Sequence, residues 1–167
     1  RWLGRDDPAW DALRAEALER RRAGAALACS IHGYDVDGRA IAIARENAAR
    51  LGLGAARFER RPLAELCPPN DATAPGLVVT NPPFGERLES GDEAAVLYRQ
   101  LGDVLRRRML GWDAFVLAPA GPLSRTLGLR TRARHVLFNG PLECRLLEVG
   151  VSATPPLGAR RSPAGTR

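Results

Sequence analysis

Apolar side chains follow two different periods along this chain. Repeats at helical spacing predict helices over residues 8–22, 38–51, 93–110 and 122–127. Short apolar or alternating runs predict strands over residues 28–34, 56–59, 77–80, 112–118, 135–138 and 142–151. Asn139-Gly140 separates the last two strands and favours a β-hairpin. Strands that alternate with helices and end in an antiparallel hairpin predict an α/β fold.

The strand at Leu77–Thr80 is the most informative one because of the residues that follow it. Its apolar, β-branched sequence is typical of a buried parallel strand. Asn81, Pro82, Pro83 and Phe84 come directly after it. The two prolines cannot continue the strand, because they fix φ twice and remove two N–H donors. We therefore expect a rigid elbow at the carboxyl edge of the sheet, where open α/β folds place their ligands.

This elbow carries groups that suit a planar ring with an exocyclic amino group. The side-chain oxygen of Asn81 and the carbonyl of Pro82 are two acceptors, and Phe84 offers a face for stacking. A Pro-Pro turn with a partly buried phenylalanine would be a purely structural alternative. A strand followed by Asn-Pro-Pro-aromatic resembles the catalytic motif of S-adenosylmethionine-dependent methyltransferases that modify amino groups. The resemblance implies that Asn81, Pro82, Pro83 and Phe84 are catalytic.

The wider resemblance is to Rossmann-like methyltransferases, and it covers most of residues 7–151. It is most specific to the ribosomal large-subunit guanine-N2 methyltransferases, in the stretches 33–37, 76–88, 127–130 and 139–144. That family implies a mostly parallel sheet into which the last strand inserts antiparallel, and a THUMP-like RNA-binding domain upstream. The family's Gly-rich turn has no counterpart before Ile31, so we expect the sheet to lack its first, central strand.

The chain begins with Arg1 rather than methionine, so we expect an N-terminally truncated piece that is inactive in isolation. Residues 1–151 would form a partial methyltransferase catalytic domain. Residues 152–167 are rich in proline, glycine, alanine and arginine and are expected to be a disordered tail.

The same resemblance implies the residues that would hold S-adenosylmethionine. Asp35 ends a predicted strand at the position where an acid accepts both ribose hydroxyls in related folds. Helix capping is the alternative role, but Asp37 is better placed for it. Val36 and Asn81 are further expected cofactor contacts.

One cofactor contact departs from the family pattern. The family often has an acid after the next strand, where it bonds the adenine amine, whereas this chain has the segment 60–63 with the sequence Arg-Arg-Pro-Leu. Packing of Leu63 on the adenine and bonding by backbone groups are the two alternatives that the sequence leaves open.

The charge of the chain indicates a polyanionic partner. The net charge is +6, from 25 basic residues that are all arginine and 19 acidic residues. Codon usage in a GC-rich genome explains the preference for arginine over lysine, but not the excess over acids. The planar fork of arginine suits phosphate. With the resemblance, this predicts ribosomal RNA as the partner, bound by Phe84, Arg87, Arg130 and Arg132; a solvated surface is the alternative role for these arginines.

Cysteine usage and hydropathy indicate which compartment and which partners to expect. Cys29, Cys67 and Cys144 are isolated, without the spacing of metal ligands, and their odd number argues against a disulfide framework. We expect small, partly buried side chains in a reducing, cytoplasmic compartment, and no metal. No apolar run is long enough to span a membrane and no signal peptide opens the chain, so no membrane partner is expected.

These observations favour methylation of a guanine exocyclic N2 amine in 23S ribosomal RNA, carried by the elbow. Two alternatives remain within the same chemistry, a DNA adenine-N6 and a protein glutamine-N5 methyltransferase, because both use a similar elbow. A third alternative is a non-catalytic, basic RNA-binding remnant. The arginine excess and the continuation 85–88 favour RNA as the substrate.

Overall fold

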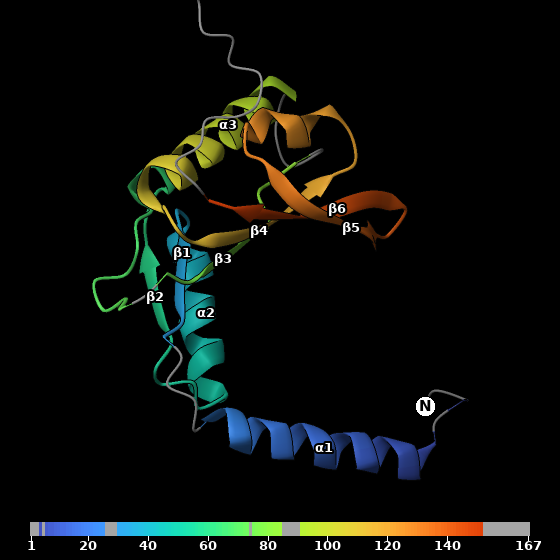
Figure 1. Ribbon diagram of the computed structural model, residues 1–167. Coiled ribbons are helices and arrows are strands. Elements are labelled where there is room, and N and C mark those ends of the chain that lie inside the picture. The colour runs from blue at the N-terminus through green and yellow to red at the C-terminus, as the bar shows by residue number, and fades with distance from the viewer. Residues whose placement is uncertain (1–3, 5, 26–29, 74, 85–90, 152–167) are drawn as a thin grey trace, which may run out of the picture.

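The computed structural model describes residues 4, 6–25, 30–73, 75–84 and 91–151. The predicted tail and Arg87 lie outside these residues. The elements are α1 (Asp7–Ala25), β1 (His32–Asp35), α2 (Gly38–Arg50), β2 (Arg57–Arg60), the short 3-10 helix η1 (Leu63–Glu65), β3 (Leu77–Thr80), α3 (Gly91–Arg108), β4 (Asp113–Pro119), the 3-10 helix η3 (Pro122–Leu127), β5 (Thr131–Asn139) and β6 (Leu142–Gly150). This order confirms the predicted α/β class (Figure 1).

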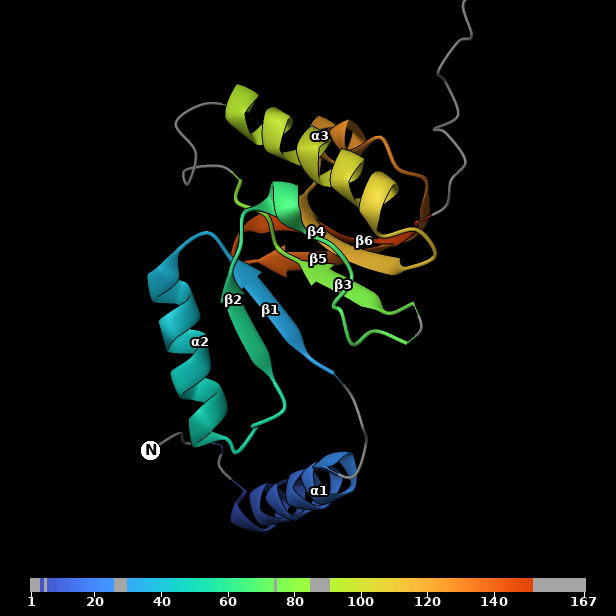
Figure 2. The same ribbon diagram turned by 90° about the vertical axis from the view of Figure 1, so that its left-hand side faces the viewer.

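The strands form two sheets. β1 and β2 pair in parallel, and the larger sheet has the order β3-β4-β6-β5. In that sheet β3 and β4 are parallel, whereas β6 lies antiparallel to both of its neighbours. An antiparallel strand inserted beside β4 is the arrangement that the sequence predicted. Within the described residues β1 and β3 do not pair, so the sheet is interrupted at the place expected for the first, central strand (Figure 2).

The helix ends follow local signals, with one shift. Asp37 caps α2 as predicted, because its Oδ1 accepts from the backbone N–H of Arg39 at 2.8 Å. Gly52 ends this helix with φ of +69°, a conformation that favours glycine. The sequence predicted that the first helix would be capped by Asp7, but at α1 the cap is Asp6, because Asp6 Oδ1 accepts from the backbone N–H of Ala9 at 3.1 Å.

The β5–β6 hairpin differs from the sequence prediction in its turn. Asn139 pairs with Leu142, so Gly140-Pro141 forms the two-residue loop, one residue later than predicted. Gly140 has φ of +60°, and glycine in the first loop position is the preference of type II′ turns. An irregularity lies between Thr131 and Ala133 on the first arm. The extra residue there is Arg132.

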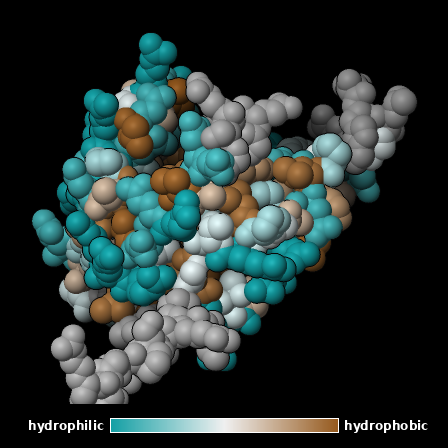
Figure 3. Space-filling model, turned by 90° about the horizontal axis from the view of Figure 1, so that it is seen from above, coloured by the Kyte–Doolittle hydropathy of each residue, from teal (hydrophilic) through white to brown (hydrophobic). Residues whose placement is uncertain are grey.

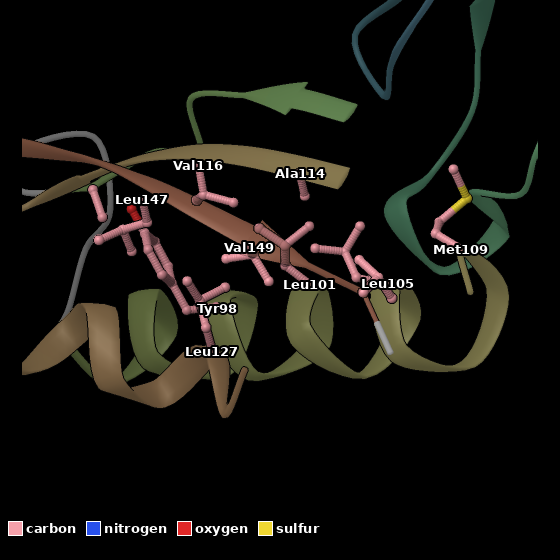
Figure 4. Close-up of a cluster of buried hydrophobic side chains, with 11 residues drawn as sticks. Tyr98, Leu101, Leu105, Met109, Ala114, Val116, Leu127, Leu147 and Val149 are labelled. Carbon is pink, nitrogen blue, oxygen red and sulfur yellow. The ribbon is translucent and has the colours of Figure 1, made fainter. Parts of the chain in front are cut away.

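The hydrophobic core lies between one face of the larger sheet and the pair α3 and η3. Figure 4 shows its side chains filling the space between these layers; the fully buried ones include Tyr98, Leu105, Met109, Val116, Leu147 and Val149. At Gly102 of α3 a Cβ would clash with the backbone carbonyl of Leu127 in η3. The close packing of these two helices therefore depends on the absence of a Cβ atom at Gly102.

Tyr98 places a hydroxyl in this core without a hydrogen-bond partner among the described residues. Burial, and next the nearby Cys144 thiol, raise the pKa of Tyr98 to about 12. The unfolded chain would release this proton near pH 10, so the free energy of unfolding should fall as the pH rises from 10 to 12.

We expect Tyr98→Phe to remove this alkaline loss and to raise the free energy of unfolding at neutral pH by about 1 kcal/mol, because an unsatisfied buried hydroxyl disappears. Urea unfolding of both proteins across the pH range measures the difference. A parallel fall in stability for the two proteins above pH 10 would contradict the assignment to Tyr98.

Helix α1 stands apart from the two sheets in both ribbon views (Figures 1 and 2). A hydrogen bond joins it to the end of α2, from Arg21 Nη2 to the carbonyl of the C-cap residue Leu51 at 2.7 Å. None of the described helices combines the length and the apolar character needed to cross a membrane. On the face seen in Figure 3, hydrophilic surface surrounds separate hydrophobic patches.

Candidate functional site

The residues predicted to act on cofactor and substrate lie at the carboxyl ends of two strands. Asp35 is the last residue of β1, and Asn81 is the first residue after β3. The arrows of β1 and β3 point the same way in Figure 2, so both ends face the same side of the molecule. The interruption between the sheets lies between them. This edge is where parallel α/β sheets bind ligands.

The four residues of the elbow differ in their exposure to solvent. Asn81 is exposed, Pro82 is buried, and Pro83 and Phe84 are half-buried. The strand before it is fixed by β4, because Thr80 pairs with Val116. The Asn81 amide has no hydrogen-bond partner among the described residues. The elbow can therefore offer this amide oxygen to a ligand, whereas burial of Pro82 leaves its carbonyl role a prediction.

Asp35 is held by two hydrogen bonds and still has a free oxygen. Its Oδ1 accepts from the backbone N–H of Asp37 at 2.8 Å, and its backbone carbonyl accepts from Arg61 N–H at 2.9 Å. The side chain is exposed, and its Oδ2 has no partner among the described residues. Val36 beside it is 60% exposed. A fixed carboxylate next to an open apolar side chain fits a ribose with its attached base.

Leu63 starts η1 after the two residues that follow β2, and it is half-buried. Together with Leu66 it packs against the core beneath α3. Arg60, also from the segment without the family's acid, donates from Nε to the carbonyl of Val36 at 2.8 Å. This hydrogen bond connects the end of β2 to the end of β1. A contact of Leu63 with adenine stays a prediction.

The arginines predicted to bind RNA are not equivalent. Arg132 Nη1 pairs with Asp113 Oδ1 at 2.6 Å across the sheet. Arg130 is exposed and has no ion-pair partner among the described residues. The irregularity of β5 at Arg132 also interrupts the two-residue alternation of side chains along that strand. Arg130 is therefore free to bind a phosphate, while Arg132 would first have to leave Asp113.

A hollow of about 300 Å³ on the face of the β1–β2 pair contains residues that the sequence did not single out. His32 and Tyr34 alternate along β1 and so share this face. His32 Nε2 lies 3.3 Å from Asp71 Oδ1, and the Arg61 guanidinium lies 4.4 Å from the centre of the Tyr34 ring. Burial raises the pKa of Tyr34, and Arg61 opposes that shift. The hollow runs along this face as far as the carboxyl end of the strand pair, where Arg61 follows the last residue of β2.

Residues that could bind metal are not gathered in the part of the chain that the structure describes. No group of three or more histidine, cysteine or acidic residues is placed to share an ion there. Cys67 is half-buried and Cys144 is buried, both with free thiols, and Cys29 lies outside the described residues.

The interrupted parallel sheet, the inserted antiparallel strand and the elbow after β3 define a methyltransferase domain of the Rossmann-like class. The chain belongs to the family described as RMKL-like, methyltransferase domain, whose model matches residues 3–148.

Comparison with individual proteins agrees with this family. A "Ribosomal RNA large subunit methyltransferase K/L" from Allochromatium vinosum is 46% identical over 147 residues, which are 87% of this chain and 20% of that protein. A protein of the same name from Syntrophotalea carbinolica is 45% identical over 161 residues, 95% of this chain and 22% of its own. The crystal structure of SMU.472 complexed with SAH superposes with a TM-score of 0.68 at 28% identity, covering 89% of this chain and 38% of that one. The chain thus spans about a fifth of the curated relatives it matches.

Proposed function

We propose that this chain is part of an enzyme that methylates the exocyclic N2 amine of a guanine in 23S ribosomal RNA. The observation that carries the proposal is the exposed Asn81 amide, without a hydrogen-bond partner among the described residues, on a proline-fixed elbow at the carboxyl edge of the sheet. The relatives named as ribosomal RNA methyltransferases support RNA as the substrate. A THUMP-like domain in the longer protein would add RNA contacts to those of this chain.

The elbow would act on a guanine by positioning and by electrostatics. The N2 lone pair of guanine is delocalised into the ring, which makes it a poor nucleophile. The Asn81 side-chain oxygen and the Pro82 carbonyl would accept both N2 hydrogens and direct the lone pair. Positive charge grows on this nitrogen during attack, so these acceptors bind the transition state more strongly than the ground state. Phe84 would stack on the base after it has left its helix or loop.

The methyl donor is S-adenosylmethionine, whose sulfonium supplies an activated methyl group and leaves as a neutral thioether. The residues at the end of β1 fit S-adenosylmethionine. Asp35 Oδ2, which has no partner among the described residues, can accept hydrogen bonds from ribose hydroxyls. Val36 can cover one side of the adenine. Asn81, at the end of β3, would lie between the donor and the guanine. Transfer would join N2 to the methyl carbon as the carbon–sulfur bond breaks, and the proton that N2 loses would pass to solvent water.

The chemical identity of the methylated product distinguishes the proposed function from its alternatives. Incubation of the protein, as its host produces it, with labelled S-adenosylmethionine and unmodified 23S ribosomal RNA should place the label in N2-methylguanosine after nuclease digestion. Double-stranded DNA and total protein serve as competing acceptors. Label in N6-methyladenine of DNA, or in protein glutamine, would replace the proposal by one of the alternatives that share this elbow.

A further inference from the structure

The far end of the β5–β6 hairpin exposes apolar side chains that the core does not use. Phe138 is 71% exposed and Val136 is 57% exposed. β5 is an edge strand of the larger sheet. Arg134, Val136 and Phe138 alternate along it and therefore share one face of the strand. Single exposed apolar residues are ordinary, but a neighbouring pair on an edge strand, in line with a cation, indicates a contact surface.

The pairing register places this surface at the same edge of the sheet as the elbow. One row of paired residues crosses the four strands at Thr80, Val116, Leu147 and Arg134. β3, β4 and β5 run in the same direction, so Asn81 and Phe138 both lie beyond the carboxyl side of this row. From strand spacing and rise, Phe138 lies roughly 15–20 Å from the elbow. An extended RNA strand would cover this span with a few nucleotides.

The charges around the hairpin select an anionic partner. Arg130 and Arg134 are exposed, and neither has a hydrogen-bond or ion-pair partner for its side chain among the described residues. Glu143, which pairs with Phe138 across the hairpin, is itself bound to Arg145 at 3.4 Å. An exposed aromatic ring on the same strand face as Arg134, an arginine without a side-chain partner among the described residues, matches the way proteins bind single-stranded nucleic acid, with the bases stacked and the phosphates held by charge.

We propose that the hairpin is a second RNA contact, in which Phe138 stacks on an unpaired base near the target guanine and Arg134 holds the intervening phosphates. The proposal rests on the RNA substrate of the proposed function. The hairpin would hold the RNA strand along the carboxyl edge of the sheet. A base flipped out of that RNA would then reach the elbow from a fixed direction.

The test measures RNA binding without a methyl donor, with the protein as its host produces it and a short single-stranded RNA oligonucleotide as the probe. Phe138→Leu, which keeps an apolar side chain but removes the ring, should weaken binding about 5- to 150-fold, and Phe138→Tyr should restore it. Arg134→Ala should reduce the slope of log affinity against log salt by about 0.7, whereas Phe138→Leu should leave that slope unchanged.

Two matched controls separate the hairpin surface from general effects. Leu137→Ala truncates an exposed apolar side chain on the other face of β5, and Arg14→Ala removes an exposed charge from α1; both should bind RNA as the unmodified protein does. Affinity of Phe138→Leu within twofold of normal would overturn the proposal and assign the apolar tip to a protein partner.

Failure of the two proposals can be told apart. If Phe138→Leu binds normally while N2-methylguanosine is formed, only the hairpin contact is wrong. If no N2-methylguanosine is formed but Phe138→Leu loses affinity, the hairpin contact stands and the proposed reaction is wrong.

Discussion

In the protein as its host produces it, replacement of Asn81 by alanine should slow single-turnover methyl transfer to 23S ribosomal RNA by about 10²–10³, equivalent to ~3–4 kcal/mol of barrier. The side chain is exposed and has no partner among the described residues, so its loss should leave the fold intact. The two prolines, together with the pairing of Thr80 to Val116, still fix the turn. Rapid-quench measurement with saturating enzyme isolates the chemical step.

Phe84→Ala is the matched variant within the same elbow. It should lower productive RNA binding by about 1–3 kcal/mol through lost stacking, with a smaller effect on transfer once RNA is bound. Affinity for S-adenosylmethionine should change little in either variant. Near-normal transfer by Asn81→Ala would mean that the elbow is only a turn, and the catalytic assignment would fail.

Gly102→Ala should lower the free energy of unfolding by about 3 kcal/mol, the largest loss of stability that we expect from a single methyl group in this chain. The added Cβ would clash with the Leu127 carbonyl, a backbone atom that cannot rotate away. Either α3 must move off η3, or η3 must shift on the sheet, and both responses open the core around Leu105 and Val116. Denaturant unfolding followed by circular dichroism measures the change.

Gly24→Ala provides the control for the intrinsic preference of helices. Gly24 lies in α1, and a Cβ there would meet nothing within 4 Å. This substitution should raise the free energy of unfolding by no more than about 0.5–1 kcal/mol, because alanine favours a helix over glycine but Gly24 lies in the last turn of α1. Equal effects of the two substitutions would show that α3 and η3 do not pack as closely as the structure indicates.

Most elements could be predicted from the sequence because their signals are local. The bounds of β3 and η3 agree residue for residue with the prediction, and Asp37 and Gly52 bound α2 as expected. Prolines, caps and apolar spacing act within a few residues, and the tertiary fold did not override them. The shift of the hairpin loop to Gly140-Pro141 shows the limit, because two adjacent turn signals competed and strand pairing decided between them.

By itself the sequence determined the class of fold, the elbow at the end of β3 and the position of Asp35 at the end of β1. Only the tertiary structure decided which side chains remain free there. It left Asn81 open but buried Pro82, paired Arg132 with Asp113, and formed a hollow over Tyr34. These outcomes depend on register and packing between residues far apart in the chain. No local pattern encodes them, because a side chain's partner is set by the neighbouring strand or helix.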